Sequence, residues 1–185
     1  MRFDGRWKIV AVAMLLLGAA APAPAPVPAG YRLDHFHAPV PDRLPGGGVV
    51  TLRALRALVA RRAAVLIDVA EAPRKPAELP AGTLWLPPPH RDIPGSLWLP
   101  DAGLGKVSPG FVTWFHAELA AATQNDKART LVFYCHPDCW MSWNAARRAV
   151  RAGYTHVLWD PGGVDAWAAA GLPLAVAAPH PPPSP

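Results

Sequence analysis

The sequence is short of cysteine, of charge and of long apolar runs. It contains 2 cysteines among 185 residues, and Asp, Glu, Lys and Arg together make up 17%. The formal net charge of +5 at pH 7 is too small and too dispersed to indicate a nucleic-acid-binding protein. The apolar run that ends at Ala21 is too short to span a bilayer comfortably. Hydrophobic residues still make up 51%, which predicts a sizeable core in one domain.

The amino-terminal residues have the composition of a secretory signal peptide. Basic residues precede an apolar run (9–17), and small residues follow at 18–21. We therefore expect residues 1–25 to be a signal peptide cleaved near 19–25, with a periplasmic location. Membrane contact would occur only through this segment before cleavage. No cysteine lies near the cleavage region, which excludes lipid attachment there, and an uncleaved membrane anchor is the alternative.

The 24 prolines mark the parts of the chain that lack regular structure. They crowd residues 22–28, 73–100 and 179–185. We expect an irregular N-terminal arm over 26–47, lying across a folded domain at 48–175, and a Pro-rich tail at 176–185. Within the domain, residues 72–91 form a Pro-rich excursion.

Apolar runs and helical spacing alternate through the domain. The runs predict strands at 65–69, 97–99, 131–134 and 156–159. The spacing predicts helices at 52–62, from Ser108-Pro109 onward, at 142–152 and at 164–170. Strands that alternate with helices favour a single α/β domain with a parallel sheet covered on both faces.

Both cysteines lie in one short loop between a predicted strand and a predicted helix. Cys135 ends the strand, and Cys139 follows after three intervening residues. Ligands bind beyond the carboxyl ends of parallel strands, and a helix N-terminus stabilises a thiolate. The loop residues that would surround the sulfur atoms are His136, Pro137, Asp138, Trp140, Met141 and Ser142. This arrangement predicts a site for sulfur chemistry.

The two cysteines allow three interpretations. In the first, Cys135 is the attacking thiolate with a low pKa, and Cys139 resolves the product as a disulfide. A disulfide across so short a spacing is strained and exchangeable. In the second, the disulfide only holds the loop together. In the third, Cys135, His136, Cys139 and Met141 bind Cu(I), with His90 as a further ligand.

The tryptophans divide into two groups. We expect Trp98, Trp159 and Trp167 to lie in the core. Trp140 stands beside an open loop at a helix start, so we expect it to be exposed and to contribute to a surface for a partner protein.

Five segments over roughly residues 48–175 together resemble a rhodanese-type domain. They are the strand 65–68, the turn Ile93-Pro94-Gly95-Ser96, the strand 132–135, the turn and strand 152–157, and the closing segment 162–173. The resemblance implies a rhodanese-like parallel sheet in which Cys135 carries a sulfane sulfur as a persulfide. It also implies structural signature residues at Asp68, Pro94, Gly95, Gly162, Gly163 and Trp167.

The loop itself, from Cys135 to Asn144, resembles the CXXCW-motif proteins associated with PQQ-dependent catabolism. Those are exported rhodanese-related proteins encoded near quinoprotein alcohol dehydrogenases and c-type cytochromes. The resemblance implies an accessory role in that periplasmic system, with a quinoprotein dehydrogenase or c-type cytochrome as partner and no cofactor of its own. A non-catalytic partner-binding domain and a Cu(I)-handling protein are the alternatives.

The loop departs from the usual rhodanese pattern in ways that affect the sulfur donor. It is one residue longer, and Met141 replaces the arginine that helps to bind anionic thiosulfate. Pro137 lacks an N–H donor and Asp138 adds a negative charge. We therefore expect poor transfer from thiosulfate, and a neutral or protein-bound persulfide as the better donor.

Overall fold

The computed structural model describes residues 23–183. The predicted signal segment falls almost entirely on residues 1–22, which lie outside the described residues. Within 23–183, no helix combines the length and the apolar character needed to cross a membrane.

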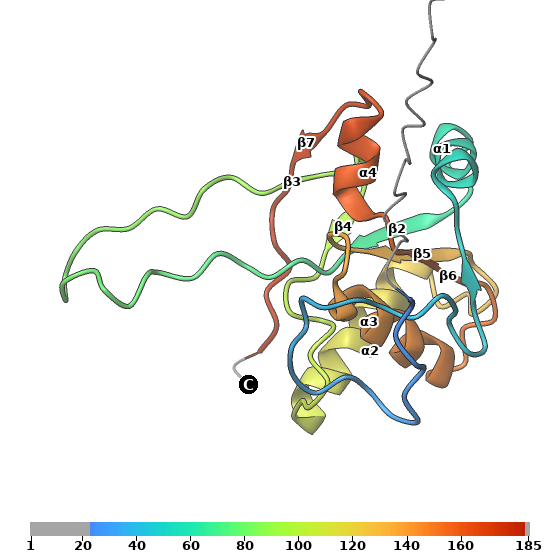
Figure 1. Cartoon of the computed structure of the whole chain (residues 1–185), viewed down its shortest axis with the longest axis horizontal. Coiled ribbons are helices and arrows are strands. Elements are labelled where there is room, and N and C mark those ends of the chain that lie inside the picture. The colour runs from blue at the N-terminus through green and yellow to red at the C-terminus, as the bar shows by residue number, and fades with distance from the viewer. Residues whose placement is uncertain (1–22, 184–185) are drawn as a thin grey trace, which may run out of the picture.

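The domain is built on a five-stranded, wholly parallel sheet with strand order β1-β6-β5-β2-β4 (Figure 1). The strands are β1 (Gly48–Val49), β2 (Val65–Asp68), β4 (Leu97–Trp98), β5 (Leu131–Tyr134) and β6 (Val157–Asp160). A separate antiparallel pair joins β3 (Arg91–Asp92) to β7 (Ala175–Val176). The predicted parallel sheet is confirmed, and β5 and β2, the strands with the longest apolar runs, lie inside it.

Helices cover both faces of the sheet, as predicted. In Figure 1, α1 (Leu52–Ala60) and α4 (Gly163–Ala169) lie on one face, and α2 (Pro109–Thr123) and α3 (Trp140–Arg151) on the other. The start of α2 follows the sequence closely: the Ser108 hydroxyl accepts a 3.2 Å hydrogen bond from the Phe111 N–H, and Pro109 is the first helical residue. Helix α3 begins at Trp140, two residues before the predicted start at Ser142.

The alternation of side chains along β5 divides the core into two layers. Leu131 and Phe133 pack with residues of α2 and α3, whereas Val132 and Tyr134 pack with residues of α1 and α4. All four side chains are fully buried. A strand buried on both faces needs an unbroken apolar run, which is the pattern seen in the sequence.

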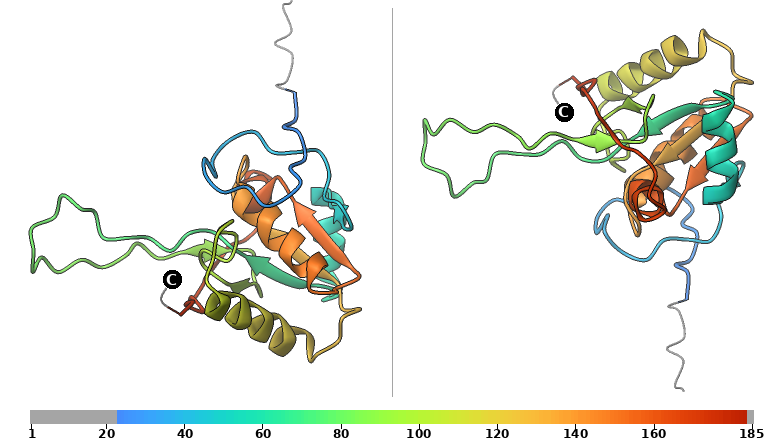
Figure 2. Two further views of the ribbon diagram at one scale, coloured as in Figure 1. Left: turned by 90° about the horizontal axis from the view of Figure 1, so that it is seen from below. Right: turned by 90° about the horizontal axis from the view of Figure 1, so that it is seen from above.

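The Pro-rich excursion has no regular structure between β2 and β3 and projects away from the body of the domain (Figures 1 and 2). Leu84 and Leu86 on this projection are 85% and 78% exposed. Such large exposed aliphatic side chains on an extended segment are a feature of interaction surfaces.

Candidate functional site

The two cysteines meet at the carboxyl edge of the sheet. Cys135 directly follows β5, and Cys139 is the N-cap residue of α3. Asp138 has a φ of 52°, in the left-handed region, which aspartate tolerates better than most residues. The chain reverses there and returns Cys139 to Cys135. Both are free thiols with 1% exposure, hydrogen-bonded to each other.

The surroundings of the two sulfur atoms differ. Around the Cys139 sulfur lie the Cys135 thiol and the backbone N–H groups of Met141, His136 and Ser142, although the side chain makes no capping hydrogen bond to α3. The hydrogen bond from Cys135 is the main cause that lowers the pKa of Cys139 to about 6. Donation of that same hydrogen bond, followed by burial, raises the pKa of Cys135 above its ordinary value.

The directions of the two pKa shifts differ from the expected ones. The sequence interpretation made Cys135 the thiolate with the low pKa, whereas in the structure the pKa of Cys135 is raised and that of Cys139 is lowered. The main cause is the hydrogen bond from Cys135, and backbone N–H groups at the start of α3 add to the lowering.

A histidine–aspartate pair lies beside the loop. The Nδ1 atom of His136 and the Oδ2 atom of Asp165 are 2.6 Å apart, and about half of each side chain is exposed. Asp165 lies in the first turn of α4. The pair fixes the imidazole of the residue that follows Cys135 against the start of α4. Sequence reasoning missed Asp165 as a functional residue, because the partners are separated by 29 positions.

The two signature glycines explain how α4 reaches the loop. Gly163 has a φ of 58°, and a Cβ atom there would clash with the Cys135 carbonyl oxygen. The adjacent Val164 N–H donates a 2.9 Å hydrogen bond to that same oxygen. Gly162 donates its N–H to Asp160 Oδ1 at 3.1 Å. Glycine at these positions lets α4 begin directly against the loop.

The other signature residues support the sheet edge. Pro94 and Gly95 form a turn in which Gly95 has a φ of 87° and the Ser96 N–H donates to the Ile93 carbonyl oxygen at 3.1 Å. The turn brings the Ser96 hydroxyl to 2.7 Å from the Tyr134 hydroxyl. Trp167 is buried and donates its indole N–H to the Pro173 carbonyl oxygen at 2.8 Å.

Asp68 is the hydrogen-bond partner of His90. The His90 Nε2 atom lies 2.7 Å from Asp68 Oδ2, and the imidazole stacks on Trp98 with ring centroids 3.9 Å apart. Among residues 23–183, no group of three or more His, Cys, Asp or Glu side chains is placed to hold a metal ion. The His90 ring is thus held by Asp68 and Trp98, and its use as a further Cu(I) ligand stays a prediction.

Trp140 is buried, with 2% exposure, so the prediction of an exposed docking residue is wrong. Its indole N–H donates to the Pro39 carbonyl oxygen at 3.1 Å, and its ring meets Trp143 edge-on at 5.4 Å. The cause is the N-terminal arm, which covers this end of α3. The predicted core positions of Trp98, Trp159 and Trp167 are confirmed.

The N-terminal arm also covers the loop. A single antiparallel bridge pairs His37 with Cys139, and the Ala38 N–H donates to the Asp138 carbonyl oxygen at 2.9 Å. Figures 1 and 2 show the arm, in blue, running across α3. Only the loop tip at residues 136–138 is exposed, while Met141 and Ser142 are buried with the cysteines. The arm therefore covers the Cys139 side of the loop, where both thiols are buried.

Comparisons with known proteins agree with this architecture. The model of the rhodanese-like domain family matches residues 51–170. A comparison with curated proteins finds no match.

Three solved structures are similar to the chain. An uncharacterized protein from Saccharomyces cerevisiae has 22% identity and a TM-score of 0.39, covering 67% of this chain and 92% of that chain. A thiosulfate sulfurtransferase from Pseudomonas aeruginosa has 18% identity and a TM-score of 0.47, over 76% of this chain and 22% of that chain. A human single-domain sulfurtransferase has 26% identity and a TM-score of 0.42, over 65% of this chain and 95% of that chain. The match thus spans about a fifth of the Pseudomonas chain and most of the other two.

Proposed function

Since the chain belongs to the rhodanese-like domain family, we propose that it transfers sulfur through the Cys135–Cys139 dithiol. The observation that carries the proposal is the hydrogen bond between the two thiols, which is the main cause that lowers the pKa of Cys139. A thiolate is the nucleophilic form of cysteine. A second thiol in contact with it can complete a disulfide.

The first step is attack by the Cys139 thiolate on the outer sulfur of a persulfide donor, R–S–SH. The donor S–S bond breaks, R–S⁻ leaves, and Cys139 carries the sulfur as a persulfide. The backbone N–H groups of Met141 and Ser142 face this sulfur and stabilise the charge on it.

The second step releases the sulfur. Cys135 loses its proton to the imidazole of His136, which Asp165 orients, and attacks the inner sulfur of the Cys139 persulfide. A Cys135–Cys139 disulfide forms and HS⁻ leaves, so the sulfane sulfur is reduced while the two thiols are oxidised. A partner with a reduced dithiol would restore the starting state by thiol–disulfide exchange.

The donor is a neutral or protein-bound persulfide rather than thiosulfate. Asp138 carries a negative charge at the loop tip, and Asp68 contributes to the negative surroundings of Cys135. Met141, where other rhodaneses have arginine, is buried with no charge to offer. Each of these features disfavours the binding of an anionic sulfur donor.

Disulfide exchange with a partner protein is the second candidate function. The same pairing of a thiolate with a neighbouring thiol supports it, and no sulfane sulfur is then involved. A non-catalytic partner-binding domain is a third candidate, for which the exposed Leu84 and Leu86 are the supporting feature.

The cellular setting that we propose is periplasmic PQQ-dependent alcohol oxidation. The composition of the N-terminus and the resemblance of the loop to the CXXCW-motif proteins support it. Deletion of the gene should slow alcohol oxidation by periplasmic extracts of its host, and the mature protein should begin between residues 19 and 25. An intact N-terminus on a membrane-bound protein would contradict the location.

Intact mass spectrometry tests the chemistry. After treatment with 2-hydroxyethyl persulfide, a donor whose organic part is uncharged, Cys135→Ser should gain about 32 Da, one sulfur atom, while Cys139→Ser gains none. The wild-type protein should instead release sulfide and lose about 2 Da as the disulfide forms. Thiosulfate at the same concentration should react far more slowly.

Other results would reject the proposal in defined ways. A sulfur adduct on Cys139→Ser but not on Cys135→Ser would reverse the roles of the two thiols. Disulfide exchange without any adduct would favour the second candidate. If the dithiol reacts neither with the persulfide nor with thiosulfate, the non-catalytic partner-binding domain is the remaining candidate function.

A further inference from the structure

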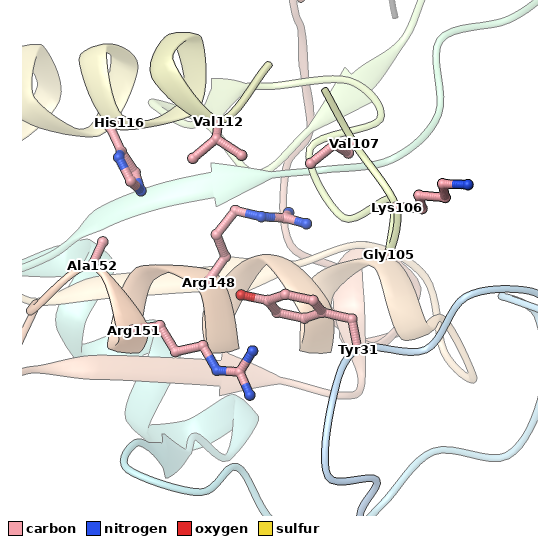
Figure 3. A pocket seen from close by; sticks show the side chains of 9 residues that line it. All are labelled: Tyr31, Gly105, Lys106, Val107, Val112, His116, Arg148, Arg151 and Ala152. Carbon is pink, nitrogen blue, oxygen red and sulfur yellow. The ribbon is translucent and has the colours of Figure 1, made fainter. Parts of the chain in front are cut away.

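A second cavity lies along the side of α3, away from the dithiol. Its volume is about 450 Å³, within the range of small-molecule sites. Figure 3 shows helices α2 and α3 along its sides, with Tyr31 of the N-terminal arm in front. The lining residues are Tyr31, Gly105, Lys106, Val107, Val112, His116, Arg148, Arg151 and Ala152. None of them is acidic.

Arg148 is a buried cation without an anionic partner. It is 4% exposed, and its guanidinium donates to the carbonyl oxygens of Ala102 and Leu104. In the part of the chain that the structure describes, no carboxylate lies within ion-pair distance of it. Burial lowers the pKa of Arg148, which reflects the cost of holding this charge out of water. An anion in the cavity would remove that cost.

Two further cations reinforce the positive charge. The guanidinium carbons of Arg148 and Arg151 each lie 4.8 Å from the centroid of the Tyr31 ring. Lys106 lines the cavity from the segment before α2. Burial, followed by the charges of Lys127 and Arg148, lowers the pKa of His116, which also lines the cavity.

The rest of the wall is apolar. Val107 and Val112 line the cavity on the α2 side, and Ala152 lines it at the end of α3. The Tyr31 ring offers a flat surface opposite them. A purely inorganic anion would leave these surfaces unused, whereas an organic acid would bury its hydrocarbon part against them.

We propose that this cavity binds a small organic carboxylate, anchored by Arg148 and packed through its apolar body against Tyr31 and Val112. Two of the five N–H bonds of the Arg148 guanidinium are used by Ala102 and Leu104. The remaining donors suit the planar carboxylate group, which guanidinium binds in a paired geometry. No catalytic step is involved.

The cavity is separate from the sulfur site. Arg148 lies nine residues beyond Cys139 on α3, which corresponds to roughly 13 Å along the helix axis at 1.5 Å per residue. Carboxylate binding can therefore be measured in a Cys135→Ser/Cys139→Ser variant. The two proposals succeed or fail independently.

Isothermal titration calorimetry of the full chain with sodium benzoate tests the proposal, together with NMR of the Arg148 Nε–H signal. We expect saturable binding that shifts this signal. The double substitution Lys106→Gln/Arg151→Gln should weaken binding about tenfold, as expected for loss of charge-assisted contacts. Val112→Phe should weaken it as strongly, because the new ring fills the cavity while every charge stays. Arg53→Gln, on α1 at the opposite face of the sheet, is the control and should leave the affinity unchanged.

Two comparison ligands separate the contribution of the ligand's negative charge from that of its apolar ring. Benzyl alcohol has the ring without the charge, and inorganic phosphate has the charge without the ring. Binding of either as tightly as benzoate would overturn the proposal, as would an absence of saturable binding. Unchanged affinity in the Val112→Phe variant would also overturn it.

Discussion

The backbone N–H of Trp140 donates a 2.8 Å hydrogen bond to the carbonyl oxygen of Phe36. This N–H is the first of α3 and has no partner within the helix. The N-terminal arm therefore provides a cap for the same helix turn that stabilises the Cys139 thiolate. The contact between the arm and the first turn of α3 therefore affects both how the loop is covered and the electrostatics of the site.

Loosening the arm should expose the thiols. Asn144, fully buried in α3, accepts from the Arg32 N–H at 2.9 Å and donates to the carbonyl oxygens of Arg32 and Gly103, each at 2.8 Å. Asn144→Ala should lower the free energy of unfolding by about 2 kcal/mol, because it leaves buried backbone groups without partners. Alkylation of the thiols by iodoacetamide should become faster, by about tenfold. The control Glu71→Ala, at an exposed position, should change neither the free energy of unfolding nor the alkylation rate. An unchanged alkylation rate in Asn144→Ala would show that other contacts hold the arm.

The hydrogen bond from Cys135 should control the charge on Cys139. Cys135→Ser keeps a donor at this position, whereas Cys135→Ala removes it. Since that hydrogen bond is the main cause of the lowered pKa of Cys139, which is about 6, the alanine variant should titrate at higher pH than the serine variant, by about one pH unit. The ultraviolet absorbance of the thiolate as a function of pH measures both values without requiring access to the buried sulfur. Identical titration curves for the two variants would contradict this account, and Cys139→Ser should show no transition near pH 6.

Substitution of Gly163 should damage both fold and site. Gly163→Ala forces a side chain into the left-handed region and against the Cys135 carbonyl oxygen, so we expect a loss of about 2–4 kcal/mol in the free energy of unfolding by urea. Gly110→Ala is the matched control, because a Cβ atom at this position of α2 comes no closer than 3.9 Å to the Ser108 hydroxyl oxygen. The control should be stabilised by about 0.5 kcal/mol. Equal effects from the two substitutions would disprove the close approach of α4 to the loop.

Stability should depend on pH through Asp160. Burial raises the pKa of this carboxyl from 3.8 to about 6, so between about pH 4 and 6 the folded protein binds a proton there more tightly than the unfolded chain does. The free energy of unfolding therefore falls as pH rises through this range, by about 2 kcal/mol for this group. Asp160→Asn keeps an acceptor for the Gly162 N–H and should flatten the slope in urea titrations at pH 4.5 and 7.0. The slope will not vanish, because burial also raises the pKa of Asp92 to about 6.

For Asp160, the control substitution is Asp42→Asn, at an exposed position. It should leave the pH dependence as it is in the wild-type protein. A slope that Asp160→Asn does not reduce would assign the pH dependence to other groups.

Local sequence patterns account for much of the fold. The apolar run at 131–134 predicts a strand because its side chains must be buried on both faces of the sheet. Ser108 and Pro109 predict a helix start because N-capping by the serine and the fixed φ of the proline involve only neighbouring backbone groups. Helix α1 ends at Ala60 rather than at the predicted residue 62, with Arg61 as its C-cap. The sequence analysis did not predict the strands β1, β3 and β7, each of which has only two residues.

The candidate site was only partly predictable. The sequence alone determined that both cysteines share one loop between a strand and a helix, because that depends on adjacent residues. Tertiary structure decided that Trp140 is buried, that Asp165 faces His136 and that the pKa of Cys139 is lowered while that of Cys135 is raised. These outcomes depend on contacts between distant segments, such as the arm against α3, where Arg32 and Asn144 are separated by 112 positions. Periodicity and propensity describe the neighbours of a residue along the chain, whereas burial and pKa depend on what packs against it from elsewhere.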